Sequence, residues 1–355
     1  MNIALLLEMA ADAAPDRTAL VCDGRRWSYA ELLGAARGAV ALIRDCGAEY
    51  VALTGESSEA AVIALFGAAL AGVPYCPLNY RLADADLGAL MARIAPALVI
   101  GEPARVEAIA SGQGHRVLDR ADFVSAAQAA APQSLDDADP GEGIAVQLFT
   151  SGTTAAPKAA ILRHGNLLGY ILGTVEFAAA DEADAALLVV PPYHIAGISA
   201  LLSSIYALRR IVMLPAFSPE GWLALVAAER VTNAFVVPTM LGRIIAAMDT
   251  SPADVSSLRA LAYGGGKMPL ETIRTALQRF PQTGFTNAYG LTETSSTIAL
   301  LGPEDHRAAL ASDDPAVQAR LTSLGQPIPT VEIEIRGEDG AVLPQGKAGE
   351  IYVRG

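Results

Sequence analysis

Residues 148–158 bring hydroxyl side chains, small residues and a single lysine together in one stretch. It reads Leu-Phe-Thr-Ser-Gly-Thr-Thr-Ala-Ala-Pro-Lys and contains the end of an apolar run over residues 144–149. Backbone N–H groups, hydroxyls and an ammonium are the donors that a polyphosphate requires. A Walker A loop is excluded, because Pro157, Lys158 and Ala159 stand where that motif needs Gly-Lys-Ser/Thr. The stretch therefore predicts a phosphate-binding loop of a different kind.

Two later segments each follow a predicted strand and carry groups suited to a nucleotide. Residues 287–293 read Asn-Ala-Tyr-Gly-Leu-Thr-Glu and end in the carboxylate of Glu293, a group that Mg²⁺ prefers as a ligand. Residues 263–269 read Tyr-Gly-Gly-Gly-Lys-Met-Pro, and such a glycine run either forms a tight turn or lets a flat ligand approach the backbone. Open parallel sheets bind ligands where their strands end, so both segments predict a site at one sheet edge.

These segments resemble the signatures of the adenylate-forming enzymes, which include acyl- and aryl-CoA synthetases, luciferases and the adenylation domains of peptide synthetases. That family has Thr-Ser-Gly-Thr-Thr-Gly-x-Pro-Lys-Gly in its phosphate loop, and here Ala155 and Ala159 replace two of its glycines. Residues 289–293 match the Tyr-Gly-x-Thr-Glu signature, and residues 191–197 match Pro-x-x-His-x-x-Gly. The resemblance covers essentially the whole chain, as the large N-terminal portion of the family.

The resemblance implies roles for the matched residues. Lys158, Thr292, Glu293 and His194 would be catalytic. Thr292 would bond the α-phosphate, Glu293 would bind Mg²⁺, and His194 would line the carboxylate end of the acid pocket. The implied nucleotide contacts are Thr150, Ser151, Gly152, Thr153, Thr154, Gly264, Gly265, Gly266, Asn287, Ala288, Tyr289, Gly290 and Thr292, with Tyr289 packing on the adenine. The implied cofactors are ATP, Mg²⁺, and coenzyme A or the pantetheine of a carrier protein.

The same resemblance gives the substrate class. Adenylating domains for amino acids carry an aspartate near the position of His194, which pairs with the ammonium of their substrate. This chain has no acidic residue between Pro191 and Leu208. A buried α-ammonium without a partner would be costly. We therefore expect a carboxylic acid without an α-amino group. Aliphatic and aromatic acids, and coenzyme A and carrier protein as acceptor, remain alternatives.

The composition of the chain limits its possible partners and its location. The 355 residues carry a formal net charge of −13, which argues against binding to nucleic acid or to an anionic membrane surface. With 52% hydrophobic residues the chain can build a sizeable core.

Cys22, Cys46 and Cys76 show no C-x-x-C spacing, which is typical of reduced cysteines in a cytoplasmic protein. We find no signal peptide, and the longest apolar run, 195–208, is shorter than the ~20 residues that span a bilayer.

The elements that position these segments alternate between strand and helix over residues 50–100 and 186–289. The alternation predicts an α/β fold with two stacked, mostly parallel βαβ subdomains, at about 1–140 and 141–320. Residues 131–143 would link them, and 321–355 would begin a small β-rich subdomain. The resemblance implies that a small C-terminal domain, with a catalytic lysine and a ribose-binding aspartate just before it, would follow Gly355, so that the isolated chain would be impaired.

The predicted activity is ATP-dependent activation of a carboxylic acid through an acyl-adenylate, followed by thioester formation. Three alternatives stay open from the sequence. The first is an acyl-AMP ligase that loads a carrier protein. The second is a phosphate-releasing NTPase switch, which forms ADP rather than AMP. The third is a non-catalytic binder of nucleotides or acyl-adenylates, which Ala155 and Ala159 would favour.

Overall fold

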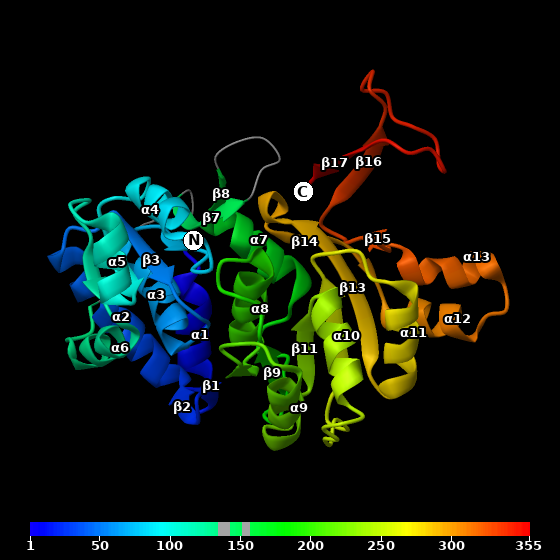
Figure 1. Ribbon diagram of the computed structural model, residues 1–355, viewed down its shortest axis with the longest axis horizontal. Helices are drawn as coiled ribbons and strands as arrows, with labels where there is room; N and C mark the ends of the chain where they lie inside the picture. Colours follow the sequence, from blue (N-terminus) through cyan, green and yellow to red (C-terminus); the bar gives the residue numbers. More distant parts are fainter. Residues whose placement is uncertain (134–142, 151–156) are drawn as a thin grey trace.

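Two large β-sheets form the framework of the protein (Figure 1). The computed structural model describes residues 1–133, 143–150 and 157–355. Within these residues one sheet has six strands and the other has nine, and a separate pair of strands lies near the C-terminal end of the chain. Most strands of both large sheets run parallel. The predicted α/β fold with two mostly parallel sheets is confirmed.

The six-stranded sheet is built mainly by the first half of the chain. Its order is β6 (Arg116–Leu118), β5 (Ala97–Gly101), β3 (Tyr50–Thr54), β4 (Tyr75–Pro77), β7 (Ile144–Thr150) and β8 (Lys158–Arg163). Only β8 is antiparallel to its neighbour. The central strands are continuous apolar runs, because helices cover both faces of the sheet.

The nine-stranded sheet carries most of the motifs. Its order is β15 (Gln326–Pro327), β14 (Ser296–Leu301), β13 (Gly284–Leu291), β12 (Ala260–Gly264), β11 (Asn233–Val236), β9 (Ala185–Leu188), β10 (Arg210–Met213), β1 (Thr18–Cys22) and β2 (Arg25–Ser28). The six strands from β13 to β1 run parallel, and antiparallel strands close both ends. The carboxyl ends of β9, β11, β12 and β13 therefore lie along one edge.

Helices fill three layers around the two sheets (Figure 1). The middle layer between the sheets contains α1 (Ala4–Ala13), α2 (Tyr29–Asp45), α3 (Glu59–Ala71), α6 (Arg120–Ala129), α7 (His164–Thr174) and α8 (Ile195–Tyr206). The outer face of the six-stranded sheet is covered by α4 (Asp84–Ala92) and α5 (Pro103–Ala110). The outer face of the nine-stranded sheet is covered by α9 (Pro219–Ala228), α10 (Pro238–Ala247) and α11 (Leu270–Arg279). Helix α3 is buried over almost all of its surface, as its nearly uncharged sequence requires.

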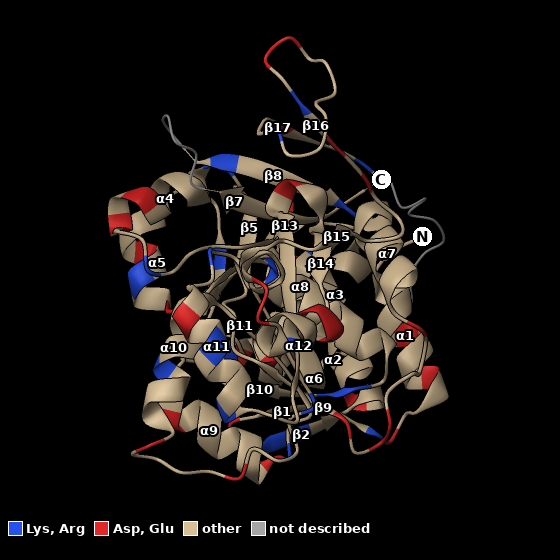
Figure 2. Ribbon diagram, turned by 90° about the vertical axis from the view of Figure 1, so that its right-hand side faces the viewer, with Lys and Arg blue, Asp and Glu red and all other residues tan. Residues whose placement is uncertain are grey.

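The C-terminal part of the chain is less enclosed. Helices α12 (Pro303–Ala311) and α13 (Pro315–Gln318) lie beyond the edge of the nine-stranded sheet, with the 3₁₀ turn η2 (Ala319–Thr322). Strands β16 (Glu332–Arg336) and β17 (Glu350–Arg354) pair with each other and project away from the two sheets (Figure 1). Charged residues lie mainly on outer helices and loops, whereas the middle layer is largely uncharged (Figure 2).

Local sequence signals explain several element boundaries. The Ser28 hydroxyl accepts a hydrogen bond from the backbone N–H of Glu31, and the Glu31 carboxylate accepts one from the Ser28 N–H. This capping box starts α2, as predicted. The Ser218 hydroxyl likewise caps α9. In contrast, α5, β6 and α6 were not predicted, nor were β14, α12, α13 and β15.

Membership of the two sheets does not follow the order of the chain. Strands β1 and β2 come first in the sequence but complete the nine-stranded sheet, whereas β7 and β8 complete the six-stranded one. The division of the chain into subdomains at about residue 140 stays a prediction. Most of the predicted linker, 134–142, lies outside the described residues. None of the helices in the described residues combines the length and the apolar character that a membrane span requires.

Candidate functional site

The predicted phosphate loop joins β7 to β8. Thr150 ends β7 and Lys158 begins β8, and the two residues pair across the antiparallel strands. Arg93 fixes the return of the chain, because its Nη1 donates to the carbonyl oxygen of Pro157 at 2.6 Å while its guanidinium stacks on Phe149 at 4.6 Å. The Lys158 side chain is exposed. Four predicted loop residues, Ser151, Gly152, Thr153 and Thr154, lie outside the described residues, as does Ala155.

Strand β8 brings the lysine segment to the second motif. It packs against η1 (Thr292–Thr294), the 3₁₀ turn that follows β13. The two motifs are separated by about 130 residues in the sequence and belong to different sheets. Strand β8, which begins at Lys158, therefore lies beside the turn that carries Thr292 and Glu293. The fold therefore brings together the two segments that the sequence predicts to bind phosphate.

The turn after β13 is held by its own hydroxyl groups. The Thr294 Oγ1 accepts a hydrogen bond from Leu291 N at 3.0 Å and lies at 3.0 Å from the carbonyl oxygens of Leu291 and Ser296. Ser295 and Ser296 follow with positive φ angles of 58° and 125°. Such angles are unfavourable for residues with a side chain and concentrate at functional sites. The turn thus has a defined shape that holds Thr292 and Glu293 at the edge of the sheet.

Glu293 is the predicted magnesium ligand, and its side chain is exposed. Among the described residues no group of three or more His, Cys, Asp or Glu side chains could hold a metal ion. Magnesium keeps several waters and is commonly bound by one or two carboxylates together with substrate phosphates. The single accessible carboxylate of Glu293, on a turn that packs against β8, fits that mode of binding. Magnesium bound in this way does not need a preformed cage of protein ligands.

The glycine run lies next to the same motif. Tyr263 and Gly264 pair with Asn287 and Ala288 in the parallel register of β12 and β13. A Cβ on Gly264 would lie only 2.2 Å from the Ala288 carbonyl oxygen, so a side chain there would push the strands apart. Gly265 has φ +74°, the left-handed region. The nucleotide contacts predicted at residues 264–266 and 287–290 therefore form one continuous surface.

A buried hydrogen-bond chain supports this surface from behind. The Tyr263 hydroxyl lies 2.8 Å from His306 Nε2, and His306 Nδ1 lies 2.7 Å from the Gly302 carbonyl oxygen. A carbonyl can only accept, so Nδ1 carries the proton and Nε2 accepts from the tyrosine. Burial lowers the pKa of His306, and the ring is neutral. Asn287, the partner of Tyr263 in the sheet, is also buried, and its Nδ2 donates to the Ser323 carbonyl oxygen at 2.9 Å.

His194 lies at the N-terminus of α8, after the carboxyl end of β9. Its pKa is lowered, first because surrounding protein atoms desolvate the ring and second because of the charge on Arg81. The ring centroid lies 4.7 Å from that of Tyr193, which in turn meets Tyr80 edge to face at 6.0 Å. The neutral imidazole remains exposed at the edge of the sheet. Tyr80, Arg81 and Tyr193 were not predicted as site residues, because the first two lie outside the motifs and Tyr193 stands at a variable position of the 191–197 motif.

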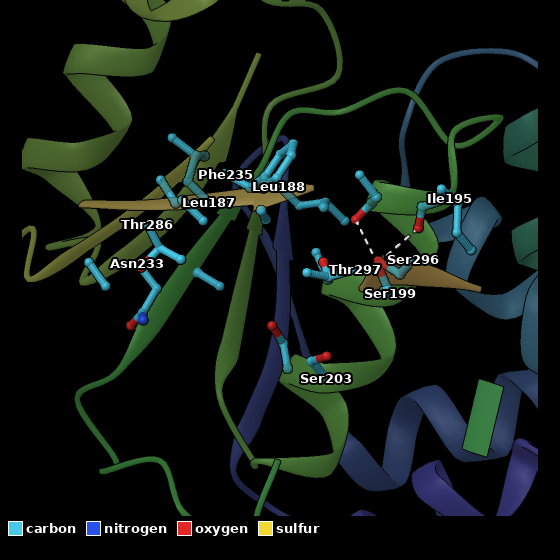
Figure 3. Close-up of a pocket in the computed structure, with 18 of the residues that line it drawn as sticks. Leu187, Leu188, Ile195, Ser199, Ser203, Asn233, Phe235, Thr286, Ser296 and Thr297 are labelled. Atoms are coloured by element: carbon cyan, nitrogen blue, oxygen red, sulfur yellow. Dashed lines mark hydrogen bonds between the residues drawn. The ribbon is translucent and has the colours of Figure 1, made fainter. Parts of the chain in front are cut away.

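A cavity of about 350 Å³ opens below this edge, between α8 and the inner face of the nine-stranded sheet (Figure 3). Residues of neighbouring strands line it, and many are small. Among them are Ala186, Leu187 and Leu188 of β9, Asn233, Ala234 and Phe235 of β11, Ala260 and Ala262 of β12, and Thr286, Ala288 and Gly290 of β13. Alanine and glycine leave space where a core would carry larger side chains. The volume is in the range of sites for small ligands.

Hydroxyl groups line the helix side of the cavity. The Ser199 and Ser296 oxygens lie 2.9 Å apart, and Ser199 Oγ also lies 3.0 Å from the Ile195 carbonyl oxygen, which it can donate to. Ser203 lies one helical turn further along α8 (Figure 3). Sequence reasoning missed this cavity, because only the register of four strands shows that their small residues align.

Comparison with known proteins identifies the family. A family model described as AMP-binding enzyme matches residues 7–355. A feruloyl-CoA synthase from Amycolatopsis sp is 29% identical over 353 residues, which are 97% of this chain and 68% of the relative. The fatty acid–[acyl-carrier-protein] ligase ScoC from Streptomyces coeruleorubidus is 26% identical over 359 residues, 96% of this chain and 66% of the relative.

A solved structure has the same fold. The o-succinylbenzoate CoA synthetase (MenE) from Bacillus subtilis, in complex with the acyl-adenylate intermediate OSB-AMP, superposes with a TM-score of 0.82 and 26% identity. The match covers 99% of this chain and 69% of that one, so the chain spans about two thirds of the length of its relatives. The resemblance found in the sequence is confirmed, and the chain belongs to the family of AMP-binding enzymes.

Proposed function

We propose that this protein activates a carboxylic acid with ATP to an acyl-adenylate and transfers the acyl group to the thiol of coenzyme A. The observation that carries the proposal is the contact between β8, which begins at Lys158, and η1, which contains Thr292 and Glu293, next to a largely apolar cavity lined by Gly290 and Ser296. Membership of the AMP-binding family, with relatives that are CoA synthetases and ligases, supports the same reaction.

Adenylation needs little covalent chemistry from the protein. The carboxylate oxygen attacks the α-phosphorus, the bond from that phosphorus to the bridging oxygen breaks, and pyrophosphate leaves. Positioning of the two reactants and neutralisation of phosphate charge supply most of the rate. We assign phosphate binding to Lys158, Thr150 and the loop residues after it, and the α-phosphate contact to Thr292. A bound Mg²⁺ would offset phosphate charge, and Glu293 is the side chain that would hold it.

The remaining assignments follow from position along the sheet edge. The surface of residues 264–266 and 287–290 would accept the adenine, with Tyr289 packed against the base. His194 lies near the mouth of the cavity, where the reacting carboxylate would enter. Its lowered pKa keeps the ring neutral, so it can orient the carboxylate by a hydrogen bond without forming a strong ion pair. The described cavity lining contains no acidic residue, which favours an acid without an α-amino group.

A carrier protein is a second candidate acceptor. The observation in its favour is the similarity to ScoC, a fatty acid–[acyl-carrier-protein] ligase. Coenzyme A and a carrier present the same pantetheine thiol, so the adenylation site would not differ between them. The unpaired cysteines Cys22, Cys46 and Cys76 support a reducing, cytoplasmic location, where both acceptors occur.

The test combines binding with product analysis. Mg·ATP binding should be measured by calorimetry for the parent, Lys158→Ala and Glu293→Gln, with Lys267→Ala as a control that removes another exposed ammonium, just after the glycine run. Loss of one charge-assisted contact should weaken binding about ten- to a hundredfold in the first two variants. The control should bind like the parent. In a screen of acids, an accepted acid should support exchange of labelled pyrophosphate into ATP, and turnover with coenzyme A should then release AMP and not ADP. Equal binding by all four proteins, or release of ADP, would contradict the proposal.

A further inference from the structure

One charged group in the cavity has no role in the proposed reaction. Arg209 lines the cavity together with Ser203, Ser204 and Asn233. All four lie at the amino edge of the sheet, because Asn233 begins β11 and Arg209 directly precedes β10. His194 and the nucleotide surface lie at the opposite, carboxyl edge. The part of α8 that lines the cavity, from Ile195 to Ser204, rises by about 13 Å, so Arg209 lies far from the reacting carboxylate.

The alternation of side chains along β10 explains why an arginine points into this space. Ile211 and Met213 belong to the core between the sheets, whereas Val212 belongs to the core on the outer face. Arg209 is in phase with Ile211 and therefore faces the helix α8 side, where the cavity lies. Arg210 has the opposite phase, and its guanidinium pairs with the Glu229 carboxylate. Two adjacent arginines thus enter different environments, and among the described residues Arg210 has a carboxylate partner whereas Arg209 has none.

Arg209 is partly buried without a counter-charge. Its side chain forms no ion pair or hydrogen bond with any described residue, and its Nε atom is fully buried without a partner. Burial lowers the pKa of Arg209, and the Tyr29 hydroxyl raises it to a smaller extent. The guanidinium remains charged at neutral pH. A buried donor that lacks a partner carries a desolvation cost, which a ligand with an anionic group would relieve.

The neighbours of Arg209 are also donors without a protein acceptor. Neither the Ser203 hydroxyl nor the Ser204 hydroxyl has a hydrogen bond in the described part of the chain, although both residues line the cavity. Between this polar end and the mouth, the lining is mostly apolar, with Leu188, Ile195 and Phe235 among it. The cavity is therefore suited to a molecule with an apolar middle and a polar, anionic far end.

We propose that the acid activated by this protein carries a second carboxylate at the end remote from the reacting one, and that Arg209 binds it. The planar guanidinium can pair with both oxygens of a carboxylate, with the two serine hydroxyls as further donors. The proposal rests on the proposed function, since it names the substrate class of the same site.

A competing explanation gives Arg209 a purely structural role. Arg209 follows the C-terminus of α8, where a cation interacts favourably with the helix dipole. In that case the arginine would stabilise the fold and would not distinguish between acids. The two explanations differ in their dependence on the ligand, so the test compares matched ligands.

The test uses acyl-sulfamoyl adenosines, stable analogues of acyl-adenylates, as probes. Each analogue with an acyl chain ending in a carboxylate, from glutaryl to sebacyl, is paired with the analogue of the same chain length ending in a methyl group. Calorimetry on the whole chain should show at least one pair in which the carboxylate-ended analogue binds tighter, by roughly ten- to a hundredfold. Arg209→Gln should abolish that preference while binding methyl-ended analogues like the parent, and Arg209→Lys should retain part of it.

A control variant and the pattern of binding distinguish failure of the Arg209 inference from failure of the proposed function. Arg116→Gln removes an exposed arginine from the other sheet and should keep the full preference. If both kinds of analogue bind but no pair shows a preference, the inference is wrong and the proposed function stands. A preference that survives in Arg209→Gln, or a uniform loss of affinity for both kinds with a lower melting temperature, also overturns it. If no analogue of either kind binds, the proposed function itself fails.

Discussion

The three consecutive glycines at 264–266 predict three different responses to alanine. A Cβ on Gly264 would meet the Ala288 carbonyl oxygen at 2.2 Å, well inside the 3.0 Å that such contacts respect. The obstacle is backbone of the paired strand, so β12 and β13 must separate by nearly an ångström. Overpacking of this kind costs about 1–3 kcal/mol, and a rigid backbone neighbour favours the upper end. We expect Gly264→Ala to lose about 3 kcal/mol of unfolding free energy.

Alanine at Gly265 or Gly266 should be less destabilising than alanine at Gly264. Gly265 has φ +74° with its nearest neighbour, Val237, at an ordinary 3.5 Å, so alanine there should cost the left-handed penalty of about 1–2 kcal/mol. Gly266 has ordinary φ and only Pro238 nearby, at 3.8 Å. Alanine at Gly266 should be neutral or stabilising by up to about 1 kcal/mol, because it restricts the unfolded chain.

Urea unfolding of the three variants and the parent checks the order. The midpoint should fall most for Gly264→Ala and less for Gly265→Ala, and it should not fall for Gly266→Ala. Mg·ATP affinity should fall for Gly264→Ala as well, since its strand partner Ala288 belongs to the proposed nucleotide surface. If Gly264→Ala is as stable as the parent, or if Gly266→Ala is equally destabilised, then the close approach of the two strands is not as described.

Two further predictions concern stability. The folded-state pKa of His306 lies below its ordinary value, so the unfolded chain takes up the proton first and stability should fall as the pH drops below about 6.5. His306→Gln should flatten this decline between pH 7 and pH 5 in thermal unfolding, and an unchanged slope would exclude the histidine as its source. Ser28→Ala should cost about 1 kcal/mol, because it removes the cap of α2. Ser58→Ala is the control in urea unfolding, since the buried Ser58 hydroxyl has no partner in the described structure, and an equal loss in both variants would refute the capping argument.

The sequence predicted those elements whose signals are local. Strand β1 has the predicted bounds Thr18–Cys22, because an apolar run ends at the turn residues Asp23 and Gly24. The helices α5 and α6 were missed although Pro103 and Asp119 mark their starts. Both are short, and few of their residues are buried, so their periodic pattern is weak.

The sequence predicted the chemical groups of the site better than it predicted the shape of the cavity. The motifs place Lys158 and Glu293 at strand ends, and the fold brings their segments together. The cavity depends on small residues such as Ala186 and Ala260, which on their own indicate neither a pocket nor a core. The side chain of Arg209 faces the cavity because of the alternation of side chains along β10. The sequence alone does not define the first residue of that strand to better than a few positions, so this orientation could not be predicted.

The placement of the first hairpin, β1 and β2, in the nine-stranded sheet has a consequence for synthesis. Val21 of β1 pairs with Val212 of β10, about 190 residues later in the chain. At translation rates of about 5–20 residues per second, β1 waits on the order of 10–40 seconds for its partner strand. During that time β1 and Trp27, which are buried in the finished protein, have no sheet to join. The nine-stranded sheet can therefore not be completed while the chain is still short, and the first hairpin is the segment for which a ribosome-associated chaperone would have the longest opportunity to bind.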